Sequence, residues 1–325
     1  MKIGIIGAGA WGTALSYYYS AYFGEENVIM WTRNQQVADD INSQENSKYL
    51  PLPPSHRLIL GYATTNKTKF NNFNSDFIFL TIPSQNLREV LMDGFELDGK
   101  NLIICAKGIE NSSLKFMHEV VEEMFPNANI AVLSGPNLAH EIVKDLPTNT
   151  LIASRHVIFK EFADQSSSDN FKFHFSEDII GAQIFGACKN ILAIGCGIVR
   201  GLEIGDNGFA AFLNSAFEEV NELNLALGGK AKTAFSPAGL GDTILTCISQ
   251  KSRNNSLGRE IVANKDKSVK EILEFKNLLT EGYMSAKPIY ELIRKHELSL
   301  PIIESIYKIL YQNENVDIIK KLNWL

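Results

Sequence analysis

The sequence has few of the residues that build disulfide frameworks and metal sites. Its four cysteines lie far apart in apolar runs and form no CxxC pair, a pattern typical of reduced thiols in the cytosol. The six histidines show no metal-ligand spacing, so we expect no metal site. No GxSxG motif marks a nucleophilic serine, and no motif marks a cysteine nucleophile.

A basic block and an uninterrupted membrane span are also missing. Thirty-one Lys and Arg against 37 Asp and Glu give a net charge of -6, which argues against nucleic acid as a partner. The apolar stretch 179–199 could cross a membrane by length, but Gln183, Lys189 and Asn190 interrupt it, so we expect a buried helix and no membrane span. Met1 leads into a strand pattern rather than a secretory signal, and we expect a cytoplasmic protein.

The length of 325 residues predicts two domains. Short apolar runs alternate with helical patterns in the first half, which predicts an α/β domain, Rossmann-like, with a doubly wound parallel sheet. The expected strands are 2–6, 28–31, 77–82, 102–105 and 130–133, with edge strands at 150–154 and 171–175. After Asp178 the strand pattern ends. We therefore expect a dinucleotide-binding domain at 1–178 and an all-α substrate and catalytic domain at 179–325.

A glycine fingerprint opens the chain. Gly7, Gly9 and Gly12 follow the first expected strand and precede a helix, which is the context in which such a fingerprint indicates dinucleotide binding. Gly7 permits the tight turn, Gly9 lets the backbone approach a pyrophosphate, and Gly12 allows close helix packing. The alternative is a purely structural turn.

The end of the second expected strand bears on the choice of cofactor. An acidic residue there binds the ribose 2′-hydroxyl of NAD, whereas this strand ends in Trp31-Thr32-Arg33-Asn34. Because Arg33 can pair with a 2′-phosphate, we expect NADP(H) to be preferred, with NAD(H) possible. The alternative for Arg33 is a solvated surface side chain.

Lys189 lies in a helical stretch that is otherwise apolar or small. A buried ammonium group needs a carboxylate, a ligand or a lowered pKa, unless its head reaches water. Asp242, after two glycines in GLGDTILTC, is the candidate partner, with Thr246 one turn on; the alternative for Asp242 is a helix N-cap. Residues 252–255 form a donor-rich cluster suited to a phosphate or to an ordinary capped turn.

The chain resembles the NAD(P)-dependent glycerol-3-phosphate dehydrogenases of the soluble bacterial type over nearly its whole length. The strings that carry the resemblance are GAGAWGTAL at 7–15, TIPSQNLR at 81–88, AKGIE at 106–110, LSGPNLAHE at 133–141, GACKNILAIGCGI at 186–198, GLGDTILTC at 239–247, SRN at 252–254 and TEGY at 280–283. Two departures are Asn137, where the family has Ser or Thr, and Ala106, where Ser is common.

The resemblance implies roles for individual residues. Lys189 matches the catalytic acid or base, Lys107 contacts substrate and cofactor, and Asp242 balances the lysine. Implied substrate contacts are Lys107, Gly135, Asn137, Lys189, Asn190, Asp242, Thr246, Ser252, Arg253 and Asn254. Implied cofactor contacts, besides Gly7, Gly9 and Gly12, are Ala10, Trp11, Arg33, Lys107, Ala139, Arg253, Leu279 and Glu281.

The implied reaction is reduction of dihydroxyacetone phosphate to sn-glycerol 3-phosphate, which supplies the backbone of glycerophospholipids. A homodimer is implied as well. Two other functions stay open: a dehydrogenase of the β-hydroxyacid or 6-phosphogluconate type, whose substrate carries a carboxylate, and an NADPH-sensing module without catalysis. A sensor needs none of Lys107, Lys189 and Asp242, so their presence favours an enzyme.

Overall fold

The computed structural model describes residues 1–53, 56–249, 252–276 and 280–322. The chain divides into two compact units. Unit 1 consists of Met1–Ala106, Met117–Leu133 and Asn137–Glu177, and unit 2 consists of Lys107–Phe116, Ser134–Pro136 and Asp178–Leu325. Two short segments from the first half of the sequence, 107–116 and 134–136, thus belong to the same unit as the C-terminal helices.

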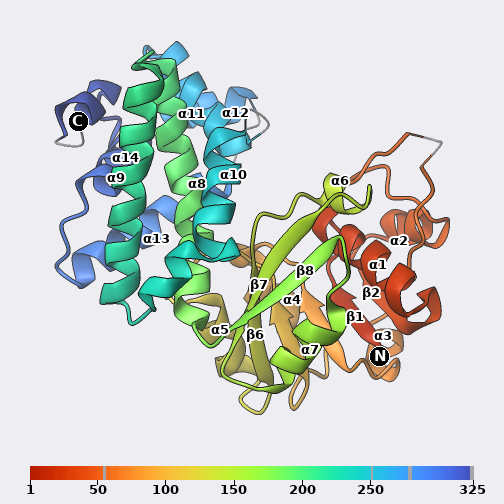
Figure 1. Ribbon diagram of the computed structural model, residues 1–325. Helices are drawn as coiled ribbons and strands as arrows, with labels where there is room; N and C mark the ends of the chain where they lie inside the picture. Colours follow the sequence, from red (N-terminus) through yellow and green to blue (C-terminus); the bar gives the residue numbers. More distant parts are fainter. Residues whose placement is uncertain (54–55, 250–251, 277–279, 323–325) are drawn as a thin grey trace. The chain divides into compact units, whose positions relative to one another are not determined.

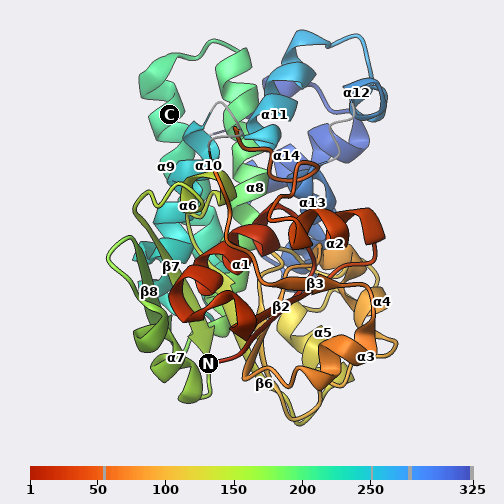
Figure 2. The same cartoon turned by 90° about the vertical axis from the view of Figure 1, so that its right-hand side faces the viewer.

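Unit 1 is built on an eight-stranded sheet in the order β3-β2-β1-β4-β5-β6-β7-β8 (Figure 1). The strands are β1 Ile3–Ile6, β2 Val28–Trp31, β3 Tyr62–Thr64, β4 Phe77–Leu80, β5 Asn101–Ile104, β6 Asn129–Ser134, β7 Thr148–Ser154 and β8 Phe171–Ser176. Six pairs of neighbours are parallel, and β7 and β8 lie side by side in both views (Figures 1 and 2). The predicted Rossmann-like α/β class is confirmed.

Helices pack on both faces of this sheet. Those of unit 1 are α1 Ala10–Phe23, η1 Glu25–Asn27, α2 Gln35–Asn42, α3 Lys67–Asn72, η2 Ser84–Asn86, α4 Leu87–Leu91, α5 Met117–Met124, α6 Ala139–Ile142 and α7 Ile158–Ser166. Tyr19 of α1 and Phe162 of α7 contact Phe79 of β4 on one face. On the other face, a Cβ at Gly4 would lie 3.0 Å from the ring of Phe70 in α3. Burial of these apolar faces holds the layers together.

Three details of the sequence prediction differ from the structure. The strand β3 was not predicted, because only three residues pair there. The strand β7 was expected at an edge but lies between β6 and β8, so only β8 ends the sheet on that side. The first helix begins at Ala10, so Gly12, which was expected to precede the helix, lies inside it.

Unit 2 contains helices in its described part, with one isolated bridge between Ile109 and Phe116. They are α8 Ile179–Gly201, α9 Gly205–Ala226, η3 Ala231–Phe235, η4 Pro237–Gly241, α10 Asp242–Ile248, α11 Arg253–Ala263, α12 Val269–Lys276, α13 Glu281–Lys295, α14 Pro301–Gln312 and η5 Val316–Lys321. The predicted all-α class is confirmed. Pro288 lies inside α13, which continues through it.

The helix α8 is the centre of unit 2, and α9, α10, α11, α13 and α14 all contact it (Figure 1). It is long and apolar enough to cross a membrane, yet 89% of its most apolar window is buried inside the protein, as in a core helix. Glycines on both helices allow α8 and α11 to pack very closely. A Cβ at Gly197 would lie 2.1 Å from the carbonyl oxygen of Asn255, and one at Gly258 would lie 2.1 Å from that of Ile194.

Candidate active site

The glycine turn between β1 and α1 has the geometry that its sequence predicts. Gly7 has a φ of 113°, which side-chain-bearing residues rarely adopt, and a Cβ there would lie 2.7 Å from Oγ1 of Thr81. A Cβ at Gly12 would lie 2.1 Å from the carbonyl oxygen of Gly7. Gly9 is different, since nothing lies within 4 Å of its Cβ position. Two glycines are therefore needed by packing, and the third leaves open space.

A cavity of about 750 Å³ opens beside this turn, within unit 1. Gly7 and Gly9 line it, together with Arg33, Lys48 and Tyr49. Gly9 is the N-cap of α1 and bears no side chain that could bond the first helical amides. An N-terminus of this kind attracts an anion through its unpaired N–H groups and the helix dipole. The open space at Gly9 and the helix end fit the pyrophosphate of a dinucleotide.

The end of β2 forms another part of this wall. Trp31 and Thr32 are buried, and Arg33 is exposed and lines the cavity with them. The side chain of Asn34 accepts a hydrogen bond from the amide of Val37 and so caps α2. Among the described residues that line the cavity, none is acidic. A carboxylate that would repel a 2′-phosphate is therefore missing from this lining.

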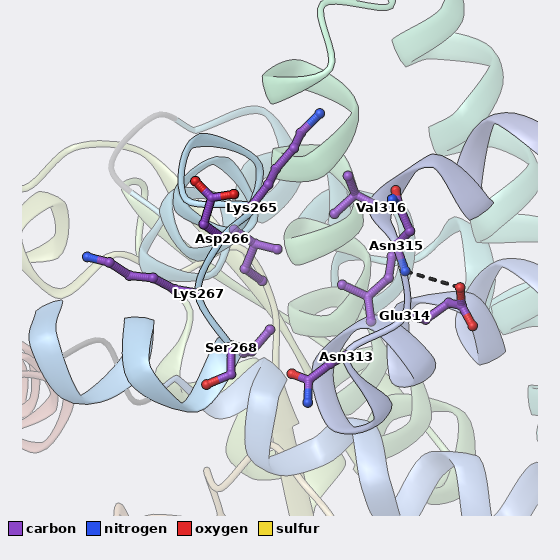
Figure 3. A pocket seen from close by; sticks show the side chains of 11 residues that line it. Lys265, Asp266, Lys267, Ser268, Asn313, Glu314, Asn315 and Val316 are labelled. Carbon is purple, nitrogen blue, oxygen red and sulfur yellow. Dashed lines mark hydrogen bonds between the residues drawn. The ribbon is translucent and has the colours of Figure 1, made fainter.

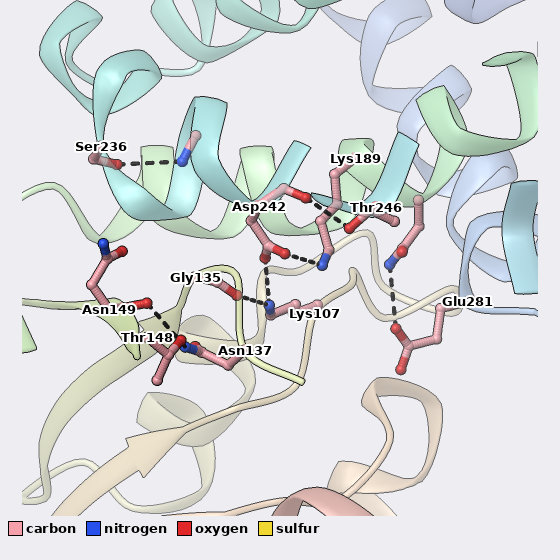
Figure 4. Close-up of polar contacts among 12 residues, drawn as sticks. Lys107, Gly135, Asn137, Thr148, Asn149, Lys189, Ser236, Asp242, Thr246 and Glu281 are labelled. Carbon is pink, nitrogen blue, oxygen red and sulfur yellow. Dashed lines mark hydrogen bonds and ion pairs between the residues drawn. The ribbon is translucent and has the colours of Figure 1, made fainter. Parts of the chain in front are cut away.

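Unit 2 brings two lysines to one buried carboxylate (Figure 4). The Oδ1 atom of Asp242 lies 2.5 Å from Nζ of Lys189, and its Oδ2 atom lies 2.5 Å from Nζ of Lys107. Nζ of Lys107 also donates to the carbonyl oxygen of Gly135 at 3.1 Å. Asp242 is 1% exposed, so its carboxylate is shielded from water; Lys189 is buried as well, and Lys107 is half-buried. Lys107, Gly135, Lys189 and Asp242 thus form one polar cluster in unit 2.

This geometry decides between the alternatives for Lys189 and Asp242. Lys189 is only 9% exposed and its ammonium group is paired, so its head does not extend to water. Asp242 is the first residue of α10 and makes no capping bond, because the N-cap is Gly241. The two glycines before Asp242 belong to Pro237–Gly241, a helical turn that runs into α10. The predicted pairing of Lys189 with Asp242 is present.

The surroundings of Lys189 change its proton affinity. Burial lowers its pKa to about 8; Asp242 opposes this shift, and the nearby charge of Lys107 adds to it. The ammonium form therefore predominates at neutral pH, and the neutral amine becomes accessible slightly above it. A group with this pKa can donate a proton in one direction of a reaction and accept it in the other.

The next residue of α8 begins a second polar network. Nδ2 of Asn190 donates to Oε2 of Glu281 at 3.2 Å, and Nδ2 of Asn254 donates to Oδ1 of Asn190 at 2.9 Å. The amide of Gly282 donates to Oδ1 of Asn254 at 3.0 Å. Residues predicted for substrate and for cofactor therefore share one set of bonds.

Other predicted residues in unit 2 lie around the start of α11 and along α10. Ser252 is the N-cap of α11, and its hydroxyl accepts a bond from the amide of Asn255. Arg253, the first helical residue, is exposed. The hydroxyl of Thr246 donates to the backbone carbonyl of Asp242 at 2.7 Å. The capped turn and the donor-rich cluster are thus one feature, not alternatives.

The remaining predicted residues fall in different places. Ala10 and Trp11 are the first residues of α1, and Ala139 is the first of α6. Asn137, in unit 1, donates through Nδ2 to Oγ1 of Thr148 at 3.0 Å and to the carbonyl oxygen of Asn149 at 2.9 Å (Figure 4). Its Nδ2 group is therefore already engaged within unit 1, whereas its Oδ1 atom is buried and accepts no hydrogen bond from the described residues. Leu279 lies outside the described residues.

Four residues around the glycine turn were not predicted from the sequence. The hydroxyl of Thr81 lies 2.8 Å from the carbonyl oxygen of Gly7 and 3.1 Å from that of Ile6. Lys48 and Tyr49 line the cavity, and buried Asn46 bonds to the turn. Asn46 lies in a polar stretch of the sequence, so nothing local marks it or tells that residue 46 meets residues 8 and 13.

A second cavity, of about 370 Å³, lies in unit 2 between the loop after α11 and the loop after α14 (Figure 3). Lys265, Lys267 and Asn315 are among its lining residues. Nζ of Lys267 lies 4.9 Å from the centre of the Phe275 ring, and its side chain points away from the opposite loop. The described lining contains none of the predicted site residues.

Known proteins resemble this chain along its full length. The family described as NAD-dependent glycerol-3-phosphate dehydrogenase matches with its N-terminal part at residues 2–159 and with its C-terminal part at residues 178–321. A protein named glycerol-3-phosphate dehydrogenase [NAD(P)+] from Parvibaculum lavamentivorans is 37% identical over 320 residues, covering 97% of this chain and 94% of the relative. One of the same name from Maricaulis maris is 38% identical, with the same coverage of both chains.

Solved structures agree with this assignment. The crystal structure of glycerol-3-phosphate dehydrogenase from Coxiella burnetii has a TM-score of 0.88 and 28% identity, and the match covers 98% of each chain. Both the sequence of each unit and the fold therefore point to one group of oxidoreductases. The chain belongs to the NAD-dependent glycerol-3-phosphate dehydrogenase family.

Proposed function

We propose that this protein reduces dihydroxyacetone phosphate to sn-glycerol 3-phosphate, reversibly, with NADPH or NADH. The observation that carries the proposal is the buried carboxylate of Asp242 between the ammonium groups of Lys189 and Lys107, in a chain whose relatives are named for this dehydrogenase. Its test is the oxidation of either cofactor in the presence of dihydroxyacetone phosphate, with a keto acid as the comparison substrate.

The dinucleotide fits the cavity of unit 1. Gly7, Gly9 and Gly12 shape the turn, and the amides at the start of α1, in Ala10 and Trp11, face an anion there. We assign residues 1–178 to dinucleotide binding and 179–325 to substrate and catalysis. Further cofactor contacts that the family resemblance supports are Arg33, Lys107, Ala139, Arg253, Leu279 and Glu281.

Lys189 donates and accepts the proton of the reaction. The bound cofactor supplies the hydride, and reduction of the ketone places negative charge on the carbonyl oxygen. Lys189 delivers a proton to that oxygen, and in the reverse direction its neutral amine accepts the proton. Lys107 adds positive charge close by, and Asp242 holds both lysines in place. The low exposure of the cluster strengthens these interactions.

The phosphate of the substrate needs donors away from the reacting carbon. Arg253 and Asn254 at the start of α11 provide a guanidinium, an amide and a helix N-terminus. Binding energy from this remote group helps to position the ketone. The other substrate contacts that we assign are Gly135, Asn137, Asn190, Thr246 and Ser252. Nδ2 of Asn137 bonds to Thr148 and Asn149, so donation to the substrate would require it to exchange one of those bonds, whereas its Oδ1 atom is not engaged by the described residues.

The rival functions make different predictions for the same assay. A dehydrogenase of the β-hydroxyacid or 6-phosphogluconate type would oxidise NADPH with a keto acid, and a sensing module would bind NADPH without turnover. The paired lysines favour an enzyme over a sensor. We further propose that the protein is a cytoplasmic homodimer that supplies the backbone for glycerophospholipids, as the family resemblance implies; gel filtration with light scattering tests the dimer.

The pH dependence of the reaction should report the pKa of Lys189. Reduction needs the ammonium form, so kcat/KM for dihydroxyacetone phosphate should fall as the pH rises through about 8, and oxidation of glycerol 3-phosphate should rise over the same interval. The measurement is a pair of pH profiles, one for each direction, from pH 6 to 10. Profiles that bend in the same direction would contradict the role of Lys189 as the proton donor and acceptor.

Arg33 should set the preference between the two cofactors. Arg33→Ala removes the guanidinium from a cavity wall whose described lining has no carboxylate, so NADPH use should weaken about tenfold or more and NADH use should change little. The check is kcat/KM for each cofactor at low and at physiological salt, because an exposed charge is screened. Equal losses for both cofactors, or a wild-type protein that prefers NADH, would show that Arg33 does not select.

A further inference from the structure

Asn46 is a buried polar residue that joins two separate segments of unit 1. It is 1% exposed. Its Nδ2 atom donates to Oγ1 of Thr13 at 2.7 Å and to the carbonyl oxygen of Ala8 at 3.1 Å. Both acceptors belong to the glycine turn and the start of α1, more than thirty positions earlier in the chain. Buried donors of this kind are costly to leave unpaired, so the two segments are held together firmly.

The hydrogen bonds continue from Thr13 to the turn itself. The hydroxyl of Thr13 donates to the carbonyl oxygen of Gly9 at 2.9 Å. Asn46, Thr13 and Gly9 are therefore linked by consecutive hydrogen bonds: the Thr13 hydroxyl accepts from Nδ2 of Asn46 and donates to the carbonyl oxygen of Gly9. Gly9 is the residue whose open space we assign to the pyrophosphate. The orientation of its peptide depends in part on Asn46.

On its other side, Asn46 begins the turn that carries Lys48 and Tyr49. The carbonyl oxygen of Asn46 accepts from the amides of Leu50 at 2.8 Å and of Tyr49 at 3.3 Å. Leu50 is buried, whereas Lys48 and Tyr49 are exposed and line the cavity. Asn46 thus fixes two walls of the same cavity relative to each other: the glycine turn and the turn at 46–50.

We propose that Asn46 is a positioning residue for the dinucleotide, an inference that rests on the proposed function. It does not line the cavity. It holds the glycine turn and the 46–50 turn in the arrangement that binds the cofactor. Neither turn then has to become ordered when the cofactor binds. Preorganisation of this kind raises affinity by lowering the entropy lost on binding. The effect should appear in cofactor affinity and not in turnover.

The experiment compares Asn46→Ala with Asn42→Ala. Asn42 is a matched control, because its amide bridges α2 and β3 through two bonds to the backbone of Ala63 but does not line the cavity. We expect Asn46→Ala to raise the Kd of NADPH, and of NADH, about three- to tenfold, as expected for one or two lost hydrogen bonds, while kcat at saturating cofactor stays within about twofold. Asn42 is exposed, so Asn42→Ala should lower the melting temperature less than Asn46→Ala does, and it should change neither Kd.

Thr13→Val interrupts the same series of hydrogen bonds from the other end and keeps the shape of the side chain. If Asn46→Ala folds poorly, this variant gives the test on its own, and it should raise Kd by a similar factor. In the double variant the losses should be less than multiplicative, because both substitutions break the same series of hydrogen bonds.

Two results would overturn this inference without affecting the proposed function. The first is an unchanged Kd in Asn46→Ala or, if that variant does not fold, an unchanged Kd in Thr13→Val. The second is a rise in Kd in Asn42→Ala equal to that in Asn46→Ala. A wild-type protein that binds neither cofactor would instead contradict the proposed function, and this inference with it.

Discussion

Lys189→Met should lose turnover by about 10²-fold to 10⁴-fold, the range expected when a proton-transfer group is removed. Methionine keeps an unbranched apolar side chain of similar length but has no ammonium group. Asp242 keeps its ion pair with Lys107, so no buried charge is left unpaired and the variant should fold, and the cofactor cavity in unit 1 contains no part of the side chain. NADPH affinity should therefore stay close to that of the wild type.

Steady-state kinetics and cofactor binding together check this expectation. The bend of the pH profile near 8 should disappear in the same variant, because the group that titrates is gone. The assignment of Lys189 would be wrong if Lys189→Met turned over at nearly the wild-type rate. It would also be wrong if activity fell but the bend stayed.

Asp242→Asn should lower both activity and stability. The substitution removes the charge that both lysines contact at 2.5 Å and leaves two ammonium groups facing each other in a buried place. Because Asp242 raises the pKa of Lys189 and Lys107 lowers it, that pKa should fall below its wild-type value of about 8. Less of the proton donor is then present at neutral pH, and we expect kcat for reduction to fall about 10-fold to 100-fold, since each unit of pKa below the working pH costs tenfold.

Breaking one side of a buried ion pair typically costs about 3–5 kcal/mol in the free energy of unfolding, and denaturant titration should show a loss of this size. The pH profile gives the sharper readout, since reduction by Asp242→Asn should recover toward lower pH as Lys189 regains its proton. Asp206→Asn is the matched control. Asp206 pairs with Arg200 at 2.9 Å, but its side chain is 90% exposed, so its loss should change neither quantity. A bend that stays near 8 in Asp242→Asn would contradict the proposed coupling.

Local patterns were sufficient to predict most of the α/β unit. The strands β1, β2, β4, β5 and β6 are short apolar runs buried on both faces, and such runs stand out from the sequence around them. β3 has only three residues and an exposed Tyr62, so its pairing with β2 depends on tertiary contacts that no local pattern reveals. Pro288 also depends on tertiary contacts. The helix α13 continues through it, and residues of α13 on both sides of Pro288 are buried in unit 2.

The candidate site, too, could be predicted only in part from the sequence. Lys189 could be identified from its sequence alone, because a charge among apolar helical residues demands a partner, and Asp242 followed as that partner. The meeting of Lys107 with Asp242 depends on a segment of the first half of the chain joining unit 2, which only the fold shows. Asn46 was missed because its two acceptors lie 33 and 38 residues away.

We propose that this chain transfers hydride between a nicotinamide cofactor and a three-carbon ketone phosphate with Lys189 as the proton donor. The most direct measurement is a spectrophotometric assay of NADPH and NADH oxidation with dihydroxyacetone phosphate, for the wild type and for Lys189→Met side by side. We predict rapid oxidation by the wild type with this substrate but not with a keto acid, and almost none by the variant. Turnover of the keto acid in preference to the ketone phosphate, or cofactor binding without any turnover, would contradict the claim.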